Sequence, residues 1–377
     1  MKYMGSKRAM LGNGLGELLG AEVPSSKRFA DLFAGSAAVA IHVACRYDVP
    51  VLAFDLQSYS SILAGAVIKR KAVVPPKTWF KDWLHRAKEF NNGIKIPEVS
   101  SISINAVKHC RKWCSEQDAL PITAAYGGHY FSPTQAVWID ALRASLPSSE
   151  PARTVALSAL IQSASQCAAA PGHTAQPFQP TPTAKKFLSD AWNRNIVEKA
   201  RAVFESLAKQ KANQIGNAKV SDAQEAARSL KEGDLAFIDP PYSGVHYSRF
   251  YHVLETISHG SCGQVTGIGR YPDTELRPKS KFSLISESTN ALDDLLKTVS
   301  SRGAKAILTF PDHECSNGLS GASVREIASK HFIVREKRID SKFSTLGGTS
   351  DKDRKQEAGR SARQAAKELM LVLSCKK

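Results

Sequence analysis

The residues Asp239, Pro240, Pro241 and Tyr242 directly follow the apolar run LAFI at 235–238. Such a run is typical of a strand buried on both faces, and open α/β sheets bind ligands beyond the carboxyl ends of their strands. A carboxylate and the next prolyl carbonyl can accept both hydrogens of an aromatic amine, which turns the nitrogen lone pair toward a methyl donor. The prolines stiffen this turn, and the tyrosine ring offers a stacking surface for an extruded base. We therefore expect these four residues to form a catalytic pocket rather than an ordinary strand-ending turn.

A second group of candidate residues lies in the segment DLFAGSAA, which begins at Asp31 and contains Phe33 and Gly35. The glycine follows an apolar run and would let the backbone approach a cofactor closely. A helix of small residues and a second short strand follow, and that strand ends at Asp55, whose carboxylate can hold two ribose hydroxyls. The glycine pattern alone is weak because many helix N-termini look similar, but the second acid strengthens it.

These candidates need a parallel sheet to bring them together, and the pattern of the chain predicts one. Strand, glycine turn, helix, strand and acid in succession form the opening of a doubly wound α/β fold. The same texture returns after residue 215, with further expected elements at 219–222 (strand), 223–230 (helix), 304–310 (buried strand), and 332–338 with 368–373 (closing hairpin). The fold class is therefore α/β.

Residues 69–214 have a different character, with helical periodicity and few β-branched runs. We interpret them as a mostly helical insertion that begins with the basic run Lys69, Arg70 and Lys71. A second basic segment at 342–367 contains Arg354 and Lys355. The formal net charge of +16 favours polyanionic partners, so both segments are candidates for phosphate contacts, although a solvated charged face would explain either one alone.

The composition indicates the cellular compartment that the protein is expected to occupy. The seven cysteines are scattered and never form a C-x-x-C pair, which favours a reducing cytoplasm without disulfides. Cys110 and Cys114 beside His109 lack a second pair of metal ligands, so we expect no metal site. No run of 18 apolar residues and no signal-like N-terminus is present, so we expect a cytoplasmic protein without a membrane span.

Several motifs together resemble the alpha group of DNA adenine-N6 methyltransferases. The order of Lys2-Tyr3-Met4-Gly5-Ser6-Lys7, DLFAGSAA and DPPY is similar to that of this family's two cofactor motifs and its catalytic motif. The segments HYSRFYHVLETI (246–257), GGHYFSPTQAVWIDALR (127–143) and GHTAQPF (172–178) resemble one branch of the family. The resemblance therefore extends from residue 2 to about residue 257 and is thinner beyond it.

The resemblance implies S-adenosylmethionine as the methyl donor. It implies cofactor contacts from the N-terminal motif, from Phe33 and Gly35 near the methionine part, from Asp55 at the ribose and from Asp222 at the adenine. The expected cofactor-binding residues are Tyr3, Gly5, Lys7, Asp31, Phe33, Gly35, Asp55, Asp222 and Asp239. One departure is Ala37, which stands where the family usually has a second glycine. Its methyl group could weaken cofactor binding, although a helix N-terminus is expected to tolerate alanine well.

The resemblance also implies a domain organisation and partners. Residues 1–68 and 215–377 would form a Rossmann-like class I methyltransferase domain, and 69–214 an inserted DNA-recognition domain that reads double-stranded DNA. The expected nucleic-acid contacts are His246, Tyr247, Lys69, Arg70, Lys71, His173, Arg354 and Lys355. A cognate restriction endonuclease or defence system is a further candidate partner, and we expect a monomer or weak dimer.

Three alternatives remain open at this stage. A ribosomal RNA adenine-N6 methyltransferase would share DPPY and the basic charge, and the helical insertion favours DNA only weakly. A catalytically inactive DNA-binding module is supported by Ala37 alone, and the intact DPPY at 239–242 argues against it. An N4-cytosine enzyme would be expected to carry SPPY instead.

Overall fold

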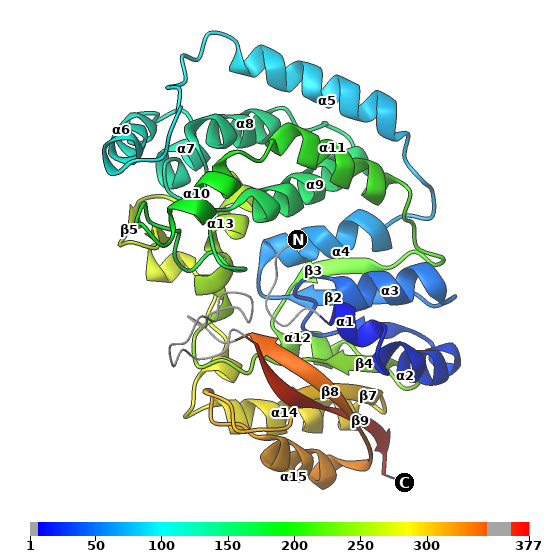
Figure 1. The fold of residues 1–377 in the computed structure, drawn as a ribbon. Helices are drawn as coiled ribbons and strands as arrows, with labels where there is room; N and C mark the ends of the chain where they lie inside the picture. Colours follow the sequence, from blue (N-terminus) through cyan, green and yellow to red (C-terminus); the bar gives the residue numbers. More distant parts are fainter. Residues whose placement is uncertain (1–6, 345–362, 377) are drawn as a thin grey trace. The chain divides into compact units, whose positions relative to one another are not determined.

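The computed structural model describes residues 7–344 and 363–376 (Figure 1). The chain folds into two compact units. The α/β unit comprises residues 7–56, 219–246 and the described residues from 279 onward. The helical unit comprises residues 57–218 and 247–278. Each unit is thus built from segments that are distant in the sequence.

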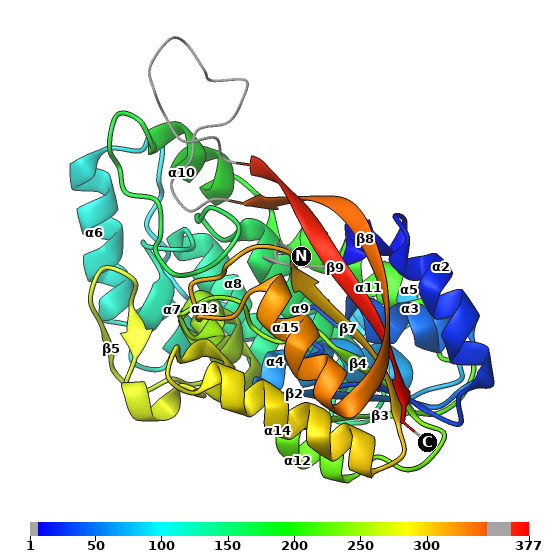
Figure 2. The ribbon, with the colours of Figure 1, turned by 90° about the horizontal axis from the view of Figure 1, so that it is seen from below.

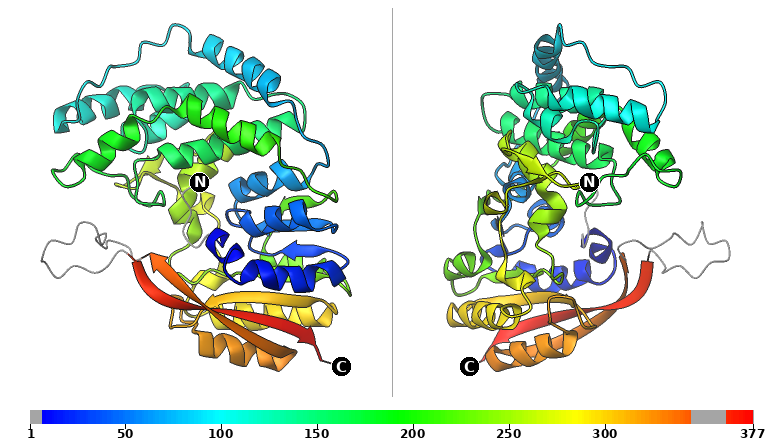
Figure 3. Two further views of the ribbon diagram at one scale, coloured as in Figure 1. Left: turned by 45° about the vertical axis from the view of Figure 1, so that its right-hand side comes forward. Right: turned by 90° about the vertical axis from the view of Figure 1, so that its left-hand side faces the viewer.

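A seven-stranded sheet forms the centre of the α/β unit. Its strand order is β3 (Asn217–Val220), β2 (Val51–Asp55), β1 (Phe29–Asp31), β4 (Leu235–Ile238), β7 (Lys305–Pro311), β9 (Arg363–Cys375) and β8 (Phe332–Ser344). β1 runs parallel to β2 and β4, and β4 runs parallel to β7. β9 pairs antiparallel with both β7 and β8, and the two views of Figure 3 follow this long hairpin to the C-terminus. The predicted α/β sheet and closing hairpin are confirmed.

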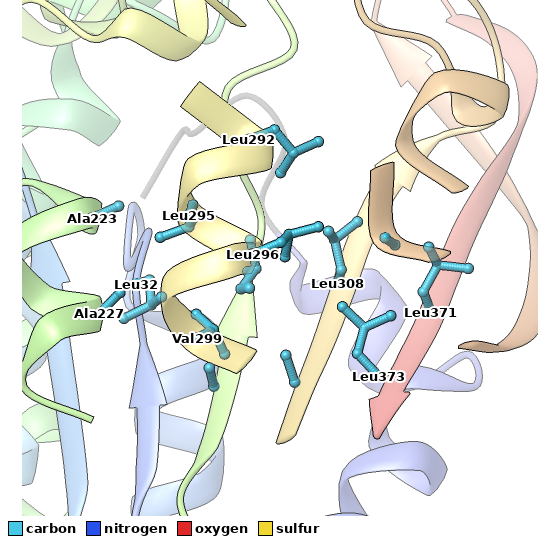
Figure 4. Close-up of a cluster of buried hydrophobic side chains, with 14 of the residues drawn as sticks. Leu32, Ala223, Ala227, Leu292, Leu295, Leu296, Val299, Leu308, Leu371 and Leu373 are labelled. Carbon is cyan, nitrogen blue, oxygen red and sulfur yellow. The ribbon is translucent and has the colours of Figure 1, made fainter. Parts of the chain in front are cut away.

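One face of this sheet is covered by α12 (Ala223–Arg228), α14 (Ser288–Ser301) and α15 (Gly321–His331), as Figure 2 shows. Alternate strand residues point toward these helices because side chains alternate across a strand. Figure 4 shows leucines of α14 packed between Leu32, Leu308 and Leu371. Full burial of each such side chain contributes about 1.5–3 kcal/mol. This cluster fixes the strands whose ends carry the candidate site.

The other elements of the α/β unit are short. They are α1 (Arg8–Leu11), α2 (Leu15–Glu22), the 3-10 turns η1 (Val23–Ser25) and η3 (Lys281–Ser283), and α3 (Ala38–Arg46), which packs on β1 and β2. α3 is the helix that the sequence predicts after the glycine turn, and its residues Val39, Ala40, Val43 and Ala44 are buried.

The helical unit is organised around α9 (Ala152–Cys167), which is buried on almost every side. Its neighbours are α4 (Ser58–Ile68), α8 (Pro133–Ala144), α11 (Ile196–Ala208) and α13 (Tyr247–His259). The remaining elements are α5 (Pro76–Asn91), α6 (Ile104–Ser115), α7 (Pro121–Tyr126), α10 (Lys185–Trp192), the hairpin β5 (Val265–Thr266) and β6 (Tyr271–Pro272), and the 3-10 turn η2 (Thr274–Leu276). None of the helices in the described part of the chain combines the length and the apolar character that a membrane span requires.

The borders of the helical unit differ from the expected insertion at 69–214. The unit also contains α4 and the segment 247–278. α4 is apolar on most of its surface, with six consecutive buried residues from Leu63 to Ile68, and it packs on α9 and α13. Hydrophobic periodicity identifies such helices but cannot show which core they join, because that choice depends on tertiary packing.

Candidate active site

Three carboxylates lie at the carboxyl ends of adjacent strands in the α/β unit. Asp31 ends β1, Asp55 ends β2, and Asp239 follows the last residue of β4. Because these strands are parallel, their carboxyl ends lie at one edge of the sheet. Both Asp239 and Asp55 raise the pKa of Asp31, so the three charges interact. The structure therefore brings Asp239 to the same edge as Asp31 and Asp55, which precede it in the sequence by 208 and 184 residues.

Asp239 is held by two donors. The Thr309 hydroxyl donates a hydrogen bond of 2.9 Å to Asp239 Oδ1, and Lys7 Nζ lies 3.0 Å from the same oxygen. Burial raises the pKa of Asp239, while Lys7 and Thr309 oppose this rise because they stabilise the carboxylate. The pKa of Asp239 is raised on balance, and Lys7 and Thr309 are the two groups that orient the carboxylate and favour its acceptor form.

Lys7 is also paired with Glu368 on β9, at 2.6 Å from Nζ to Oε1. Both residues are buried, and the two carboxylates raise the pKa of Lys7 against the opposing effect of its burial. The structure gives Lys7 a role that the sequence did not predict, as counter-ion of Asp239; its cofactor contact stays a prediction. The sequence analysis did not identify Glu368 as a site residue, although a charged residue directly before the apolar run LMLVL at 369–373 could have indicated it.

Asn317 anchors the turn that follows β4. Its fully buried amide donates hydrogen bonds to the carbonyls of Pro241 at 2.8 Å and Phe282 at 3.0 Å. The ring of Tyr242 meets Phe310 edge to face, with 6.5 Å between the centroids. The turn that contains Pro240 is therefore held in place by contacts with buried residues. Nothing in the local sequence around Asn317 signals this role.

Asp31 is almost completely buried, at 1% exposure. Burial raises its pKa to about 8, helped by Asp239 and Asp55 and opposed by the backbone N–H of Phe33, which donates to Oδ1 at 3.3 Å. The acid is consequently mostly protonated near pH 7. A buried carboxylic acid beside two other acids indicates a site that would accept positive charge.

The glycine turn after β1 is bound directly to the second acid. The N–H of Gly35 donates to Asp55 Oδ2 at 2.8 Å, and Gly35 has a φ of +50°. The ring of Phe33 packs edge to face on Phe282 at 5.1 Å. Asp222 accepts a hydrogen bond from Gln224 N at 2.8 Å and caps α12. A contact between Asp222 and a cofactor stays a prediction.

Ala37 adopts the left-handed conformation, with φ +57° and ψ +16°, directly before α3. The expectation that this helix N-terminus tolerates alanine well is therefore wrong for the backbone. The conformation costs an L-residue about 1–2 kcal/mol, whereas glycine adopts it freely. The glycine that the family usually has at this position matches the backbone better than the alanine.

Replacing Ala37 by glycine is expected to stabilise the protein by roughly 0.5–1 kcal/mol, because relief of strain exceeds the added entropy of the unfolded chain. The urea unfolding midpoint measures this change. Ala44→Gly in the last turn of α3 is the matched control, and it should lower the midpoint because glycine is unfavourable within helices. Destabilisation by both substitutions would contradict the strain at Ala37.

The expected DNA contacts do not all face outward. Lys69 and Lys71 are exposed. Arg70 is buried, and its guanidinium donates to the carbonyls of Ala66, Ala72 and Leu207 in its own unit. The expected phosphate contact of Arg70 is therefore wrong in this structure: the side chain joins α4 to α11. The sequence of a basic run does not show which of its side chains are buried and bonded to backbone carbonyls and which are exposed.

The three remaining aromatic candidates have local contacts. His173 is buried, its Nδ1 accepts the N–H of Ala175, and its ring packs on Phe250. His246 is partly exposed, and its Nδ1 accepts the N–H of Ser280 at 3.2 Å. Tyr247 is the first residue of α13. Contacts of these side chains with DNA stay predictions, and Tyr3, Gly5, Arg354 and Lys355 lie outside the described residues.

The sheet order and the acids at its carboxyl edge define a class I methyltransferase fold. The chain matches the D12 class N6 adenine-specific DNA methyltransferase family over residues 3–95 and 155–308, and it belongs to this family. It is also similar to modification methylase LlaI of Lactococcus lactis subsp. lactis, with 24% identity over 318 residues. This match covers 79% of the chain and 44% of that protein, so the chain spans less than half the length of this curated relative.

Proposed function

We propose that this chain transfers a methyl group from S-adenosylmethionine to the N6 amine of an adenine flipped out of duplex DNA. The observation that carries the proposal is Asp239: a carboxylate at the end of a buried strand, fixed by Thr309 and Lys7 and followed by a prolyl turn. Such a turn presents two acceptors for one amino group. Methylation at a specific sequence is part of the proposal, and a cognate restriction endonuclease stays a prediction.

The chemistry of the acidic edge fits the methyl donor. S-adenosylmethionine supplies an electrophilic methyl group on a positively charged sulfonium. The elevated pKa of Asp31 reflects burial and two neighbouring acids, and a cation nearby would favour its ionised form. Asp55, bound to the N–H of Gly35, is the acid at the position that would hold ribose hydroxyls. We therefore assign Asp31, Gly35 and Asp55 to cofactor binding.

The proposed catalytic role of the chain is to orient an amine. Asp239 and the carbonyl of Pro240 accept the two N–H groups, so the nitrogen lone pair points toward the methyl donor. Tyr242 stacks on the extruded base. Lys7 opposes protonation of Asp239 and so favours its acceptor form. The donor would supply the methyl group and leave as S-adenosylhomocysteine. The N6 nitrogen becomes acidic only once it carries the methyl group and then releases one proton to solvent, so Asp239 does not have to act as a strong base.

The assay that tests the proposal supplies labelled S-adenosylmethionine to the purified chain with duplex DNA and, in parallel, with ribosomal RNA. We expect label to accumulate in DNA as N6-methyladenine. Preferential labelling of RNA would instead support the ribosomal alternative. Absence of label in both, together with absence of cofactor binding by isothermal titration, would support an inactive DNA-binding module.

Cofactor binding is expected to release protons near pH 7, because the bound cation lowers the pKa of Asp31 from about 8. The sign follows from the direction of this shift: the free protein holds the proton, and the complex loses it. Isothermal titration in two buffers of different ionisation enthalpy measures the release. Asp31→Asn removes the titrating group, so its heat should depend much less on the buffer. Equal buffer dependence in both proteins would contradict this role of Asp31.

A further inference from the structure

Two arginines of the helical unit lie over the ring of Tyr271. Arg249, on α13, has its Cζ 4.8 Å from the ring centroid, and Arg277, after η2, has its Cζ at 5.5 Å. The Tyr271 hydroxyl donates to the carbonyl of Ala175, which fixes the ring in place. We name these three residues the Arg249–Tyr271–Arg277 cluster.

The positive charge of this cluster is not neutralised within the described part of the chain. There, neither guanidinium has a carboxylate oxygen within 4.0 Å, although Asp273 and Glu275 lie on the same segment and are exposed. Arg277 Nη2 donates to the Thr274 hydroxyl at 3.0 Å, but its buried Nε has no partner in that part of the structure. Two like charges on one ring without a counter-ion indicate a place for an anion.

The surroundings also favour an anion over another cation. His252 is buried between this cluster and α7, and burial together with both arginines lowers its pKa to about 4. It therefore stays neutral near pH 7, and its Nε2 lies 2.9 Å from the carbonyl of Gly269. Arg277 also lines a cavity of about 450 Å³ with Ser248, Ser261 and Glu255, and the Glu255 carboxylate already accepts the backbone N–H groups of Ser58 and Tyr59. Hydroxyl and guanidinium donors in one concave surface suit phosphate oxygens.

We propose that the Arg249–Tyr271–Arg277 cluster binds a backbone phosphate of the DNA substrate. The inference deepens the proposed function and rests on it, since a duplex is the polyanion that the enzyme must hold. Planar guanidinium groups donate two parallel hydrogen bonds to phosphate, and the ring pre-orients them at a small entropy cost. The cluster lies outside the two basic segments at 69–71 and 342–367. Its first residue, Arg249, is two residues after Tyr247, which is an expected DNA contact.

The test measures the affinity of the purified full chain for a short duplex by fluorescence anisotropy across about 50–200 mM KCl. Arg249→Gln, Arg277→Gln and the double variant are compared with wild type. Each lost phosphate contact should reduce the salt slope by about 0.9, so affinity should change about threefold less across this range for each contact. Arg277→Lys should recover only part of the affinity, because lysine lacks the planar fork.

Arg201→Gln is the matched control, since Arg201 is exposed and also lies over a ring, that of Phe80, at 5.4 Å. It should leave the salt slope almost unchanged. An equal loss with Arg201→Gln would show a general effect of charge, and unchanged slopes in both cluster variants would also overturn the inference. In the described part of the chain the Arg249 side chain makes no hydrogen bond that its replacement would break, and circular dichroism checks that the variant is folded.

Cofactor titration separates this inference from the proposed function. Wild type and cluster variants should bind S-adenosylmethionine equally, because the proposed cofactor residues belong to the α/β unit. In one outcome, wild type binds no cofactor and methylates nothing, while the cluster variants still lose duplex affinity and salt slope. That result would support the phosphate site and contradict the methyltransferase proposal. If methylation is intact and the slopes do not change, only the phosphate site falls.

Discussion

Asp239→Asn is expected to lower kcat for adenine methylation by about 10³-fold, the upper range for losing one preorganised polar group. The asparagine amide keeps the shape of the side chain but has only one acceptor oxygen and no negative charge. It therefore orients the amine poorly and does not stabilise the positive charge that develops on nitrogen. Single-turnover methylation of a short duplex measures the loss.

The control for this variant is Thr309→Val, which removes the hydroxyl that donates to Asp239 at 2.9 Å and keeps the carboxylate. Its kcat should fall far less. Cofactor affinity, measured by isothermal titration, should change little in Asp239→Asn compared with kcat. Turnover close to wild type in Asp239→Asn would show that this carboxylate does not orient the amine.

Lys7→Met is expected to destabilise the protein by about 3–5 kcal/mol, because it leaves Asp239 and Glu368 buried without their counter-ion. It should also shift activity. The pKa of Asp239 rises when the ammonium is lost, so the carboxylate is protonated over a wider range. The acidic limb of the kcat/KM profile should then move to higher pH. Urea unfolding and the pH–rate profile measure the two effects.

The double variant Lys7→Met with Glu368→Gln distinguishes a charge effect from simple loss of packing. Glu368→Gln removes one of the two uncompensated charges, so the double variant should be more stable than Lys7→Met alone. Its activity should stay low, because Asp239 still lacks its partner. If the double variant instead lost as much stability as the two single variants lose together, Lys7 and Glu368 would not interact.

Local patterns were sufficient to predict the acids at the strand ends and much of the sheet. The run LAFI before Asp239 and the acid after 51–54 depend only on hydrophobic periodicity and turn chemistry, which act over a few residues. The parallel arrangement of β1, β2 and β4 then follows from the preference of βαβ units for one topology. The acids at the carboxyl edge of the sheet could therefore be predicted from the sequence.

The supporting contacts could not be predicted in the same way. Lys7 and Glu368 are 361 residues apart and meet only because β9 inserts beside β7. Asn317 acts through the carbonyl of Pro241, and any polar loop residue could have done so. The left-handed conformation of Ala37 contradicts its own local preference, which packing overrides. These features depend on tertiary geometry, which periodicity does not encode.

Nucleoside mass spectrometry on digested duplex DNA shows whether Asp239 is needed for methylation of adenine at N6. The DNA is incubated with S-adenosylmethionine and either the wild-type chain or Asp239→Asn, and the methylated bases are quantified. We expect N6-methyladenine with wild type and almost none with the variant. Equal amounts of N6-methyladenine from both proteins, or N4-methylcytosine as the product, would contradict it.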